Sequence, residues 1–489
     1  MAEQGIMARK PVAEIMKSGD AEGHQLSKTL GPFSITAMGI GAIIGAGIFV
    51  LTGTAAAQYA GPGIMLSFVV GGIACAFVGL CYAELAAMLP VAGSTYTYTY
   101  ATLGELVAWV IGWDLILEYA MGASTVAVGW SGYIVSLLRN VGINIPPALA
   151  TAPGTAITLP DGSTATGIVN LPAAIIVAAL TIMLVLGTKE SARLNNVMVA
   201  VKLSVVAAFI ALGAAYVSMA HWHPFIPANT GAFGHFGWSG VLRGASVVFF
   251  AFIGFDAVST AAQEARHPQR DMPVGILGSL VICTVLYIAV AAVLTGLVPY
   301  TELNVADPIA KGVDAIGLTW FSVLIKIGAL TGLTTVILVL LYGQSRIFFT
   351  MSHDGLMPGL FAHIHARLQT PYLSQILIGT VVAVVAALTP IHVLGEMVSI
   401  GTLFAFVLVC SAVIYLRRSN AEVFRPFRVP GVPLVPLLGI LFCLLLMAGL
   451  PLITWLRLIV WLLIGLAIYF AYGRSHSTLR HPLVGVRLP

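Results

Sequence analysis

The sequence predicts an all-α protein that crosses a membrane about twelve times. Of its 489 residues, 59% are hydrophobic and only 9% are Asp, Glu, Lys or Arg, whereas about 25% of the residues in a typical soluble domain are charged. Apolar runs long enough for a helix to span a bilayer recur along the whole chain. So few charged side chains could not cover a soluble protein of this size, so we expect the helices to lie in lipid.

Polar breaks divide the chain into apolar runs that we interpret as spans. They lie near residues 33–57, 63–89, 101–137, 169–187, 195–219, 237–262, 273–297, 318–350, 373–389, 392–416, 431–450 and 453–473. The first thirty residues are polar and lack the apolar core of a signal peptide. We therefore expect the amino terminus to stay in the cytoplasm.

The distribution of basic residues supports this placement. With the amino terminus inside, 17 of the 23 Lys and Arg residues fall on the cytoplasmic side and four on the outer side. The other two, Lys202 and Lys326, fall inside predicted spans. This asymmetry is typical of an even number of spans with both termini in the cytoplasm. The net charge of +4 then reflects topology, and we expect no nucleic-acid partner.

Several function classes find no support in the sequence. The five cysteines lie in apolar segments without a C-x-x-C pair, and the histidine pairs of the loops have no carboxylates or thiols beside them. No glycine run has the lysine of a nucleotide-binding loop. No nucleophile–base set stands out either. We expect no metal, no cofactor and no enzymatic activity.

Two predicted spans are interrupted near their middle. The first contains "GIGAIIGAGIF" (39–49), broken at Gly45, Ala46 and Gly47, and the sixth contains "FFAFIGFDAVST" (249–260), broken at Gly254 and Asp256. Glycine in a membrane helix can simply permit close packing of neighbouring helices. Because five spans separate these breaks, they occupy matching positions in two halves of five, which indicates a transporter built from inverted repeats.

Unwound helices offer backbone groups to a ligand. The N–H groups at the start of a half-helix suit a carboxylate, and the carbonyls at the end of the preceding half suit an ammonium or another cation. Glycine permits the necessary dihedral change and a close approach to the backbone. A zwitterion needs both kinds of group within a few ångströms of each other, so the predicted ligand is an amino acid.

Motifs along the chain carry a family resemblance. They are "GIGAIIGAGIFVLTG", "CYAELAAMLPVAGSTYTYTYATLGE", "GWDLILEYA", "GTKESARLNN", "FFAFIGFDAVSTAAQEARHPQRDMP", "YGQSRIFFTMSHDGLMP" and "FRPFRVPGVPLVP". From about residue 25 to 475 the chain resembles bacterial members of the cationic amino acid transporter family, in the amino acid–polyamine–organocation superfamily. The resemblance implies the LeuT-type fold in the bacterial inner membrane. Its parts would be a cytoplasmic segment (1–30), a first inverted repeat (31–219), a second inverted repeat (220–417), and two further spans with the cytoplasmic carboxyl terminus (418–489).

The resemblance also implies a substrate site at the two breaks and in span 8, formed by Ile43, Ile44, Gly45, Ala46, Gly47, Phe250, Ile253 and Leu340. The substrate carboxylate would meet the backbone N–H groups of Ala46 and Gly47. The α-ammonium would meet backbone carbonyls near Ile43, Ile44, Phe250 and Ile253. Phe250 would close over the substrate and Leu340 would line its side-chain pocket. Ala46 stands where relatives often have a hydroxyl residue, which leaves backbone recognition intact.

Lys202 lies among apolar residues of span 5. A charge there is costly, and such residues are functional candidates unless the side chain reaches an interface. It resembles the lysine that proton-coupled relatives place where sodium-coupled relatives bind sodium. Burial disfavours the charged form, so this amine could load and release a proton near neutral pH. We expect it to bridge carbonyls of the first break to span 8 near Thr334 and Thr335.

Other intramembrane charges have two interpretations each. Asp114 and Glu118 are four residues apart and so share one helix face. Glu118 would serve proton coupling as a partner of Lys202 or assist a cationic substrate, or else form a structural hydrogen bond. Asp256 would contact a substrate side chain or cap the second half-helix. We expect Lys326 to extend to the membrane surface.

Two loop segments complete the sequence-based expectations. Charges in "ARHPQRDMP" (265–273), with Arg266, Arg270 and Asp271, could form inner-gate ion pairs with Glu84 or Glu264. The outer loop at 146–167 is rich in Pro, Gly and Thr and is interpreted as a flexible loop.

These features together predict a proton-coupled L-amino acid symporter that works by alternating access. Its substrates would be neutral amino acids such as alanine, cationic ones, or both. An obligate exchanger on the same fold is the alternative, and a non-transporting amino acid sensor is a third. The expected partners are the amino acid, a proton and membrane lipids, and a small membrane accessory subunit stays open.

Overall fold

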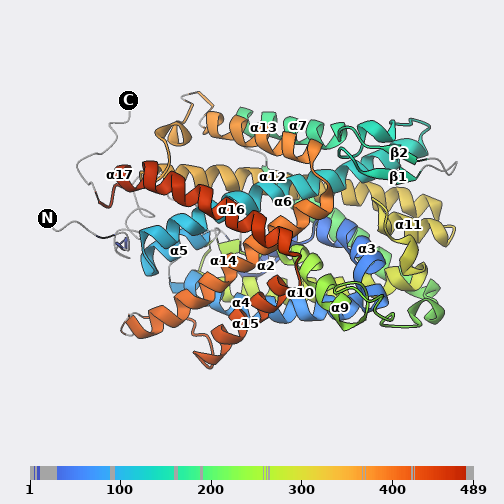
Figure 1. The fold of residues 1–489 in the computed structure, drawn as a ribbon, viewed down its shortest axis with the longest axis horizontal. Coiled ribbons are helices and arrows are strands. Elements are labelled where there is room, and N and C mark those ends of the chain that lie inside the picture. The colour runs from blue at the N-terminus through green and yellow to red at the C-terminus, as the bar shows by residue number, and fades with distance from the viewer. Residues whose placement is uncertain are drawn as a thin grey trace.

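The computed structural model describes residues 5, 8–10, 30–88, 94–158, 164–187, 191–256, 258–259, 262, 265–365, 367–368, 370–419, 422 and 424–480, with the backbone alone at 94 and 191–196. Most helices run along the long axis of the molecule (Figure 1). The helices α5 (Ser94–Thr102) and α17 (Arg474–His476) lie at one end. The helix α11 (Pro308–Ala315) and a small hairpin lie at the other end.

The remaining elements follow one another in chain order. They are α2 (Pro32–Ile43), η1 (Gly47–Leu51), α3 (Thr52–Ala55), η2 (Ala56–Ala60), η3 (Gly61–Gly63), α4 (Ile64–Met88), α6 (Glu105–Asn140), η4 (Pro147–Leu149), β1 (Ala156–Thr158), β2 (Thr164–Thr166), α7 (Leu171–Leu186), α8 (Ser191–Gly213), η5 (Ala214–Tyr216), η6 (Met219–Trp222), α9 (Gly237–Val248), η7 (Phe249–Phe252), α10 (Pro268–Leu297), η9 (Tyr300–Glu302), α12 (Thr319–His353), η10 (Gly359–Ala362), α13 (Tyr372–Leu388), α14 (Ile391–Ser419), α15 (Leu434–Ala448), α16 (Leu452–Ile468) and η11 (Tyr469–Gly473).

In the part of the chain that the structure describes, seven helical segments are long and apolar enough to cross a membrane. They are Gly47–Met88, Glu105–Asn140, Val197–Tyr216, Pro268–Leu297, Thr319–His353, Ile391–Ser419 and Leu452–His476. Five shorter apolar helices are Pro32–Ile43, which precedes the first of these segments, and Leu171–Leu186, Gly237–Phe252, Tyr372–Leu388 and Leu434–Ala448, which lie between them in the sequence. The structure is therefore that of a multi-pass helical membrane protein, and a total of twelve spans stays a prediction.

One helix boundary and one loop differ from the sequence-based expectation. The third run was predicted as one span over 101–137, but Gly104 adopts φ 101° and separates α5 from α6. Only glycine enters this region of the Ramachandran map readily, so the chain turns there. The outer loop was expected to lack structure, yet β1 and β2 pair antiparallel with Ala156 opposite Thr166. Ladder hydrogen bonds between short Thr- and Ile-containing stretches order this part of it.

Helix packing follows a pattern in which most contacts have a counterpart. The helix α4 packs on α9 and α10 packs on α2; α6 packs on α14 and α12 packs on α8; α6 packs on α13 and α12 packs on α7. In the same way α2 touches α8 and α9 touches α14. The first five apolar helices are α2, α4, α6, α7 and α8, and the next five are α9, α10, α12, α13 and α14. When each helix is replaced by the one at the same place in the other set, every pair named here becomes another of these pairs.

Both described ends of the chain reach the side of the molecule that carries α5. The buried carboxylate of Glu105 accepts hydrogen bonds from Tyr469 Oη (2.7 Å) and from Ser477 Oγ, and it pairs with Arg480 at 3.0 Å. Near it, Asp354 pairs with Lys10 at 2.8 Å. Two terminal segments are thereby anchored to the ends of α6 and α12.

At this side Glu84 has partners other than those predicted for it in the inner gate. Glu84 pairs with Arg417 (2.7 Å) and with Arg425 (3.3 Å), not with Arg266 or Arg270 among the described residues. It also accepts a hydrogen bond from the backbone N–H of Val429 at 2.7 Å, so the loop after α14 saturates this carboxylate. Asp271 instead accepts a hydrogen bond from the backbone N–H of His267 at the start of α10. Glu264 lies outside the described residues.

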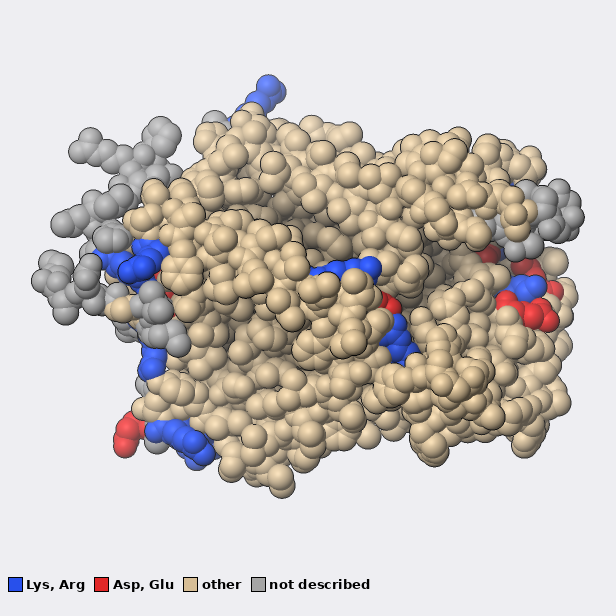
Figure 2. Space-filling view, in the orientation of Figure 1, with Lys and Arg blue, Asp and Glu red and all other residues tan. Residues whose placement is uncertain are grey.

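The surface in Figure 2 is almost uncharged between its two ends. Basic side chains gather at one end, and a mixed group of acidic and basic side chains lies at the other. A small group of both signs interrupts the middle of this face, next to a hollow. The uncharged band is what a lipid-facing surface requires.

Candidate functional site between two interrupted helices

The first interruption lies between α2 and η1. Ile44 leaves the helix with φ −73° and ψ 103°, and Ala46 is helical again with φ −60° and ψ −22°. The backbone N–H groups of Ala46 and Gly47 therefore begin a new helical segment, where donors lack intrahelical acceptors. This is the place at which the sequence predicted carboxylate binding.

The second interruption follows η7. Ile253 is extended, with φ −63° and ψ 137°, and Gly254 adopts φ 112°. A residue with a Cβ atom would be strained at Gly254, so this glycine is required by the turn itself.

The two interruptions touch each other. A Cβ atom at Gly47 would lie 2.2 Å from Ala251 Cα, and one at Gly254 would lie 2.8 Å from the carbonyl oxygen of Ala42. Both contacts are with backbone, which cannot move aside as a flexible side chain does. Glycine at these two positions therefore lets the two broken helices meet.

Tyr287 of α10 joins the two interruptions, and sequence reasoning missed it. Its hydroxyl lies 2.9 Å from the carbonyl oxygen of Ile43 and 2.7 Å from that of Ala251. A hydroxyl has a single proton, so it donates to one of these carbonyls at a time. The available signal was a lone hydroxyl in the middle of the apolar run "VLYIAV" (285–290).

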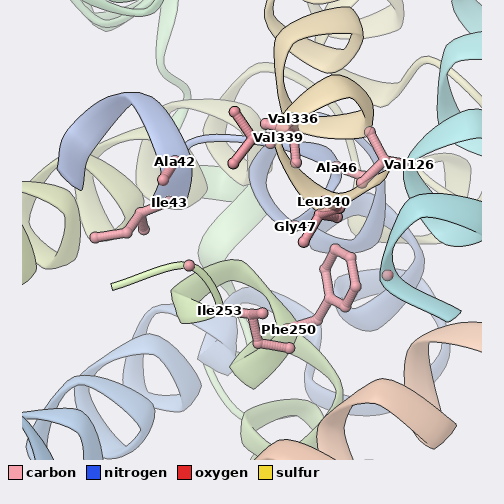
Figure 3. A pocket seen from close by; sticks show the side chains of 13 residues that line it. Ala42, Ile43, Ala46, Gly47, Val126, Phe250, Ile253, Val336, Val339 and Leu340 are labelled. Atoms are coloured by element: carbon pink, nitrogen blue, oxygen red, sulfur yellow. The ribbon is translucent and has the colours of Figure 1, made fainter. Parts of the chain in front are cut away.

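A small cavity lies between the breaks, α6 and α12 (Figure 3). It is lined by Ala42, Ile43, Gly45, Ala46, Gly47, Gly122, Val126, Phe250, Ile253, Gly254, Val336, Val339 and Leu340. Its free volume is about 20 Å³, roughly the space of one water. In Figure 3 the Phe250 ring lies beside Gly47 and Leu340. Of the predicted substrate residues, all but Ile44 line this cavity.

The side chains around this cavity are uniformly apolar. None of the lining residues carries a charge or a polar side chain. The polar groups available to a ligand are therefore those of the interrupted backbones. This division suits a ligand with a zwitterionic head and an apolar side chain.

Lys202 of α8 is completely buried and lies directly behind the first break. Its Nζ donates hydrogen bonds to the carbonyl oxygens of Gly41 and Ile44, the latter at 3.0 Å. Its aliphatic part passes α12 at Gly332, where a Cβ atom would be 3.2 Å from Lys202 Cδ. The ammonium thus occupies carbonyls that the break has freed.

The expected contact of Lys202 with span 8 takes a different form. The hydroxyl of Thr335 donates to the carbonyl of Gly332, and that of Thr334 donates to the carbonyl of Leu330. Thr334 also accepts a hydrogen bond from Trp130 Nε1 at 3.0 Å. Threonine hydroxyls in helices commonly bond to carbonyls of their own helix, so neither is drawn to the ammonium in the described structure.

The predicted carboxylates are not among the residues that line the cavity. Glu118 is buried close to Asp256 and Asp114, and it forms no ion pair with Lys202 in the described part of the chain. The carbonyl oxygen of Asp256 accepts a hydrogen bond from the backbone N–H of Ser259 at 2.9 Å. Because part of the segment after Asp256 lies outside the described residues, its capping role stays a prediction.

Lys326 differs from its expected position at the membrane surface. It is 2% exposed, and its Nζ lies 3.3 Å from the side-chain oxygen of Asn140 at the end of α6. A hydrogen-bond acceptor within the protein removes the need to reach water. Among the described residues, no group of three His, Cys, Asp or Glu side chains could hold a metal ion.

The known proteins that are similar to this chain are permeases and transporters. A family model described as amino acid permease matches residues 30–475. A branched-chain amino acid permease of Bacillus subtilis is 49% identical over 97% of this chain and 99% of its own length. A methylthioribose transporter of the same organism is 45% identical over the same shares. A vacuolar cationic amino acid transporter of Arabidopsis thaliana is 38% identical over 84% of this chain and 67% of its own.

Proposed function

Because the chain belongs to the amino acid permease family of the amino acid–polyamine–organocation superfamily, we propose that it is a proton-coupled symporter of neutral, aliphatic L-amino acids. It is a multi-pass membrane protein and not an enzyme, like the permeases and transporters to which it is similar. The observation that carries the proposal is the combination of freed backbone groups with an apolar cavity.

The backbone groups recognise the part that all L-amino acids share. The N–H groups of Ala46 and Gly47 bind the α-carboxylate, helped by the positive end of the helical segment that begins there. The carbonyls near Ile43 and Ile253 bind the α-ammonium. Each such charge-assisted hydrogen bond contributes about 1.5–3 kcal/mol, which is enough to orient a substrate in a site without charged side chains.

The apolar wall selects the side chain. Val126, Val336, Val339 and Leu340 offer no acceptor to a guanidinium or a second ammonium. Burying an unpaired cation against such a wall costs several kcal/mol. We therefore favour alanine and branched-chain substrates over arginine and lysine, as the name of the Bacillus subtilis relative also suggests for that protein.

Lys202 couples transport to protons. When charged, its ammonium holds the carbonyls of Gly41 and Ile44 and fixes the end of α2. A neutral amine holds them less strongly, because charge-assisted hydrogen bonds are about twice as strong as neutral ones. Loss of the proton therefore loosens α2 and favours opening on the side where the chain ends lie. That side is the cytoplasm in this proposal, and Glu118 is a second candidate for proton binding.

Alternating access requires two parts that move against each other. The exchange of helix contacts between the first and second five helices supports an inverted repeat, with α2 and α9 as the equivalent broken helices. In this proposal the repeats are residues 31–219 and 220–417, as in the LeuT-type fold. The very small cavity requires that the broken helices separate before a substrate enters.

Transport by purified protein in liposomes tests the proposal. Uptake of labelled L-leucine, L-alanine and L-arginine is measured with an inward proton gradient, for wild type and Lys202→Ala, with unlabelled methylthioribose as a competitor. We expect gradient-driven accumulation of leucine and alanine, and its loss in Lys202→Ala with substrate binding retained. Counterflow that ignores the gradient would support the exchanger instead, and accumulation of arginine alone would overturn the proposed substrate class.

A further inference from the structure

The chain between α10 and α12 covers part of the side of the molecule that lies opposite the chain termini. It contains η9 and α11, with residues 303–307 between them (Figure 1). A Cβ atom at Gly53 of α3 would lie 2.4 Å from Pro308 Cβ, and one at Gly132 of α6 would lie 2.5 Å from Ala306 Cβ. We call residues 303–308 the outer bridge, because they join the helical stretch after the first interruption to α6.

The outer bridge joins the same two elements that form walls of the cavity. Gly47 and Gly122 line the cavity, and Gly53 and Gly132 lie further along these two helical stretches. From Gly122 to Gly132 the helix α6 rises about 15 Å, toward its end at Asn140. The bridge therefore has to separate from one of these elements before a substrate can enter the cavity from this side.

Asp307 fixes the outer bridge to α6. Its carboxylate accepts a hydrogen bond from Ser136 Oγ at 2.5 Å, and its backbone carbonyl accepts one from the N–H of Lys311 in α11 at 3.0 Å. The side chain is partly buried, and none of the ion pairs in the described part of the chain includes it. Closure of the bridge thus takes a carboxylate out of water without giving it a cationic partner, which disfavours its charged form.

The charged groups close to Asp307 oppose one another. Lys326 of α12 and Arg139 of α6 favour the carboxylate, whereas Asp314 of α11 disfavours it. Tyr133 of α6 is also close, but a phenol is uncharged near neutral pH. Burial has the largest effect and raises the pKa of Asp307 above its ordinary value.

Closure of the bridge and proton binding are therefore linked. An open bridge exposes the carboxyl group to water, where its pKa returns toward the ordinary value. A group whose pKa is higher in the closed state than in the open state gains protons on closing, so acid favours closure and alkali favours opening. The hydrogen bond with Ser136 can persist after protonation, because a carboxylic acid keeps an acceptor oxygen and gains a donor.

We propose that Asp307 is a proton-binding residue of the outer bridge, which takes up a proton from the outer side when the bridge closes. An acidic exterior then drives the bridge from open to closed. This inference rests on the proposed function, in which the side opposite the chain termini faces the cell exterior. It adds a proton site that is separate from Lys202 and Glu118 and that acts at the opposite side from the one that Lys202 controls.

Distances between spin labels at the outer ends of α9 and α6 test this inference. Trp238→Cys and Val141→Cys replace side chains that are 73% and 69% exposed, and the five native cysteines are buried. Double electron–electron resonance of the full-length protein in nanodiscs should show a longer and a shorter distance. The share of the shorter distance should rise several-fold from alkaline to acidic pH. Lys202→Arg removes the other proposed titration and should leave this dependence in place.

Three further variants test the role of the carboxyl group. Asp307→Asn imitates the protonated acid, so it should keep the shorter distance even at alkaline pH. Lys326→Gln removes a charge that favours the carboxylate, so half of the molecules should be closed at a higher pH than in wild type. Asp314→Asn is the matched control, because it makes the same change at an exposed carboxylate of α11 and should have little effect.

The possible outcomes distinguish this inference from the proposed function. If Asp307→Asn populates the longer distance at every pH, the bridge is held by the charge of the carboxylate, and the inference is overturned. Two distances in wild type whose shares ignore pH would also overturn it but would leave alternating access in place. A single distance at every pH, with and without leucine, would contradict both.

Discussion

Both helix interruptions leave backbone carbonyls without a partner in their own helix, and the two interruptions differ in the side chains that bind these carbonyls. At the first, the carbonyls of Gly41 and Ile44 are held by the ammonium of Lys202. At the second, the carbonyl of Ala251 faces the neutral hydroxyl of Tyr287, which is shared with Ile43 of the first break, and Gly254 makes the turn at φ 112°. A titratable donor can release its carbonyls when it loses a proton, whereas a tyrosine hydroxyl and a glycine turn do not change near neutral pH. In the proposed mechanism the first break therefore changes with the protonation of Lys202, and the second break stays fixed.

The largest effect on uptake is expected from a substitution that forces the two breaks apart. Gly47→Ala places a Cβ atom against Ala251 Cα and should lower the rate of substrate uptake by more than ~10-fold, since overpacking against backbone costs about 1–3 kcal/mol or more. Gly278→Ala is the matched control, because Gly278 does not line the cavity and its new Cβ would meet the side chain of Thr36 at an ordinary 3.4 Å. Uptake assays with both purified variants give the comparison. Equal activity of the two would show that the close approach of the breaks is not required.

Replacing the switchable donor should separate binding from coupling. Lys202→Arg keeps a permanent charge, because arginine does not lose its proton in proteins. We expect this variant to exchange labelled for unlabelled leucine but to lose accumulation driven by a proton gradient, about 10-fold or more. Lys326→Arg serves as the control, since that buried lysine bonds to Asn140 and not to a break. Gradient-driven uptake by Lys202→Arg would remove Lys202 from the coupling mechanism.

The fixed donor should matter less. Tyr287→Phe leaves the carbonyls of Ile43 and Ala251 without their donor, which should lower the unfolding free energy by about 1–2 kcal/mol. Uptake should fall several-fold, yet its dependence on the proton gradient should persist. Tyr133→Phe removes a comparable buried hydroxyl, bonded to the carbonyl of Phe49 at 2.7 Å outside the two breaks. Thermal melts and uptake of both variants decide the point: loss of gradient dependence in Tyr287→Phe would contradict the division of roles.

The smallest effect is expected at the apolar wall. Leu340→Ala removes the side chain that a Cβ atom at Gly122 would approach at 3.3 Å, and so enlarges the cavity. We expect the ratio of kcat/KM for leucine to that for alanine to rise by ~3–10-fold, the range that one or two methylenes give in an apolar pocket. Competition assays with both amino acids measure it. A new preference for arginine would mean that the wall excludes cations by size and not by polarity.

The sequence predicted the helical membrane architecture because membrane helices must be long and apolar, and this property is local. The two breaks were also predicted, since Gly45, Gly47 and Gly254 mark them directly. Tyr287 and the partners of Glu84 were missed, because each depends on which distant helix or loop comes alongside. Lys202 was recognised as a buried cation, but its partners on α2 rest on resemblance and on the fold. Periodicity cannot show that Thr334 and Thr335 bond to their own helix.

The anchoring of the chain ends has a practical consequence for the study of this transporter. Ser477 and Arg480 supply donors to the buried carboxylate of Glu105, so a protein shortened before Ser477 would leave this charge with tyrosine hydroxyls and without its cationic partner. A buried charge that loses one partner typically costs about 3–5 kcal/mol. Purification tags and fluorescent reporters therefore belong after residue 480. A truncation intended only to trim the tail would instead report on the integrity of the helix bundle.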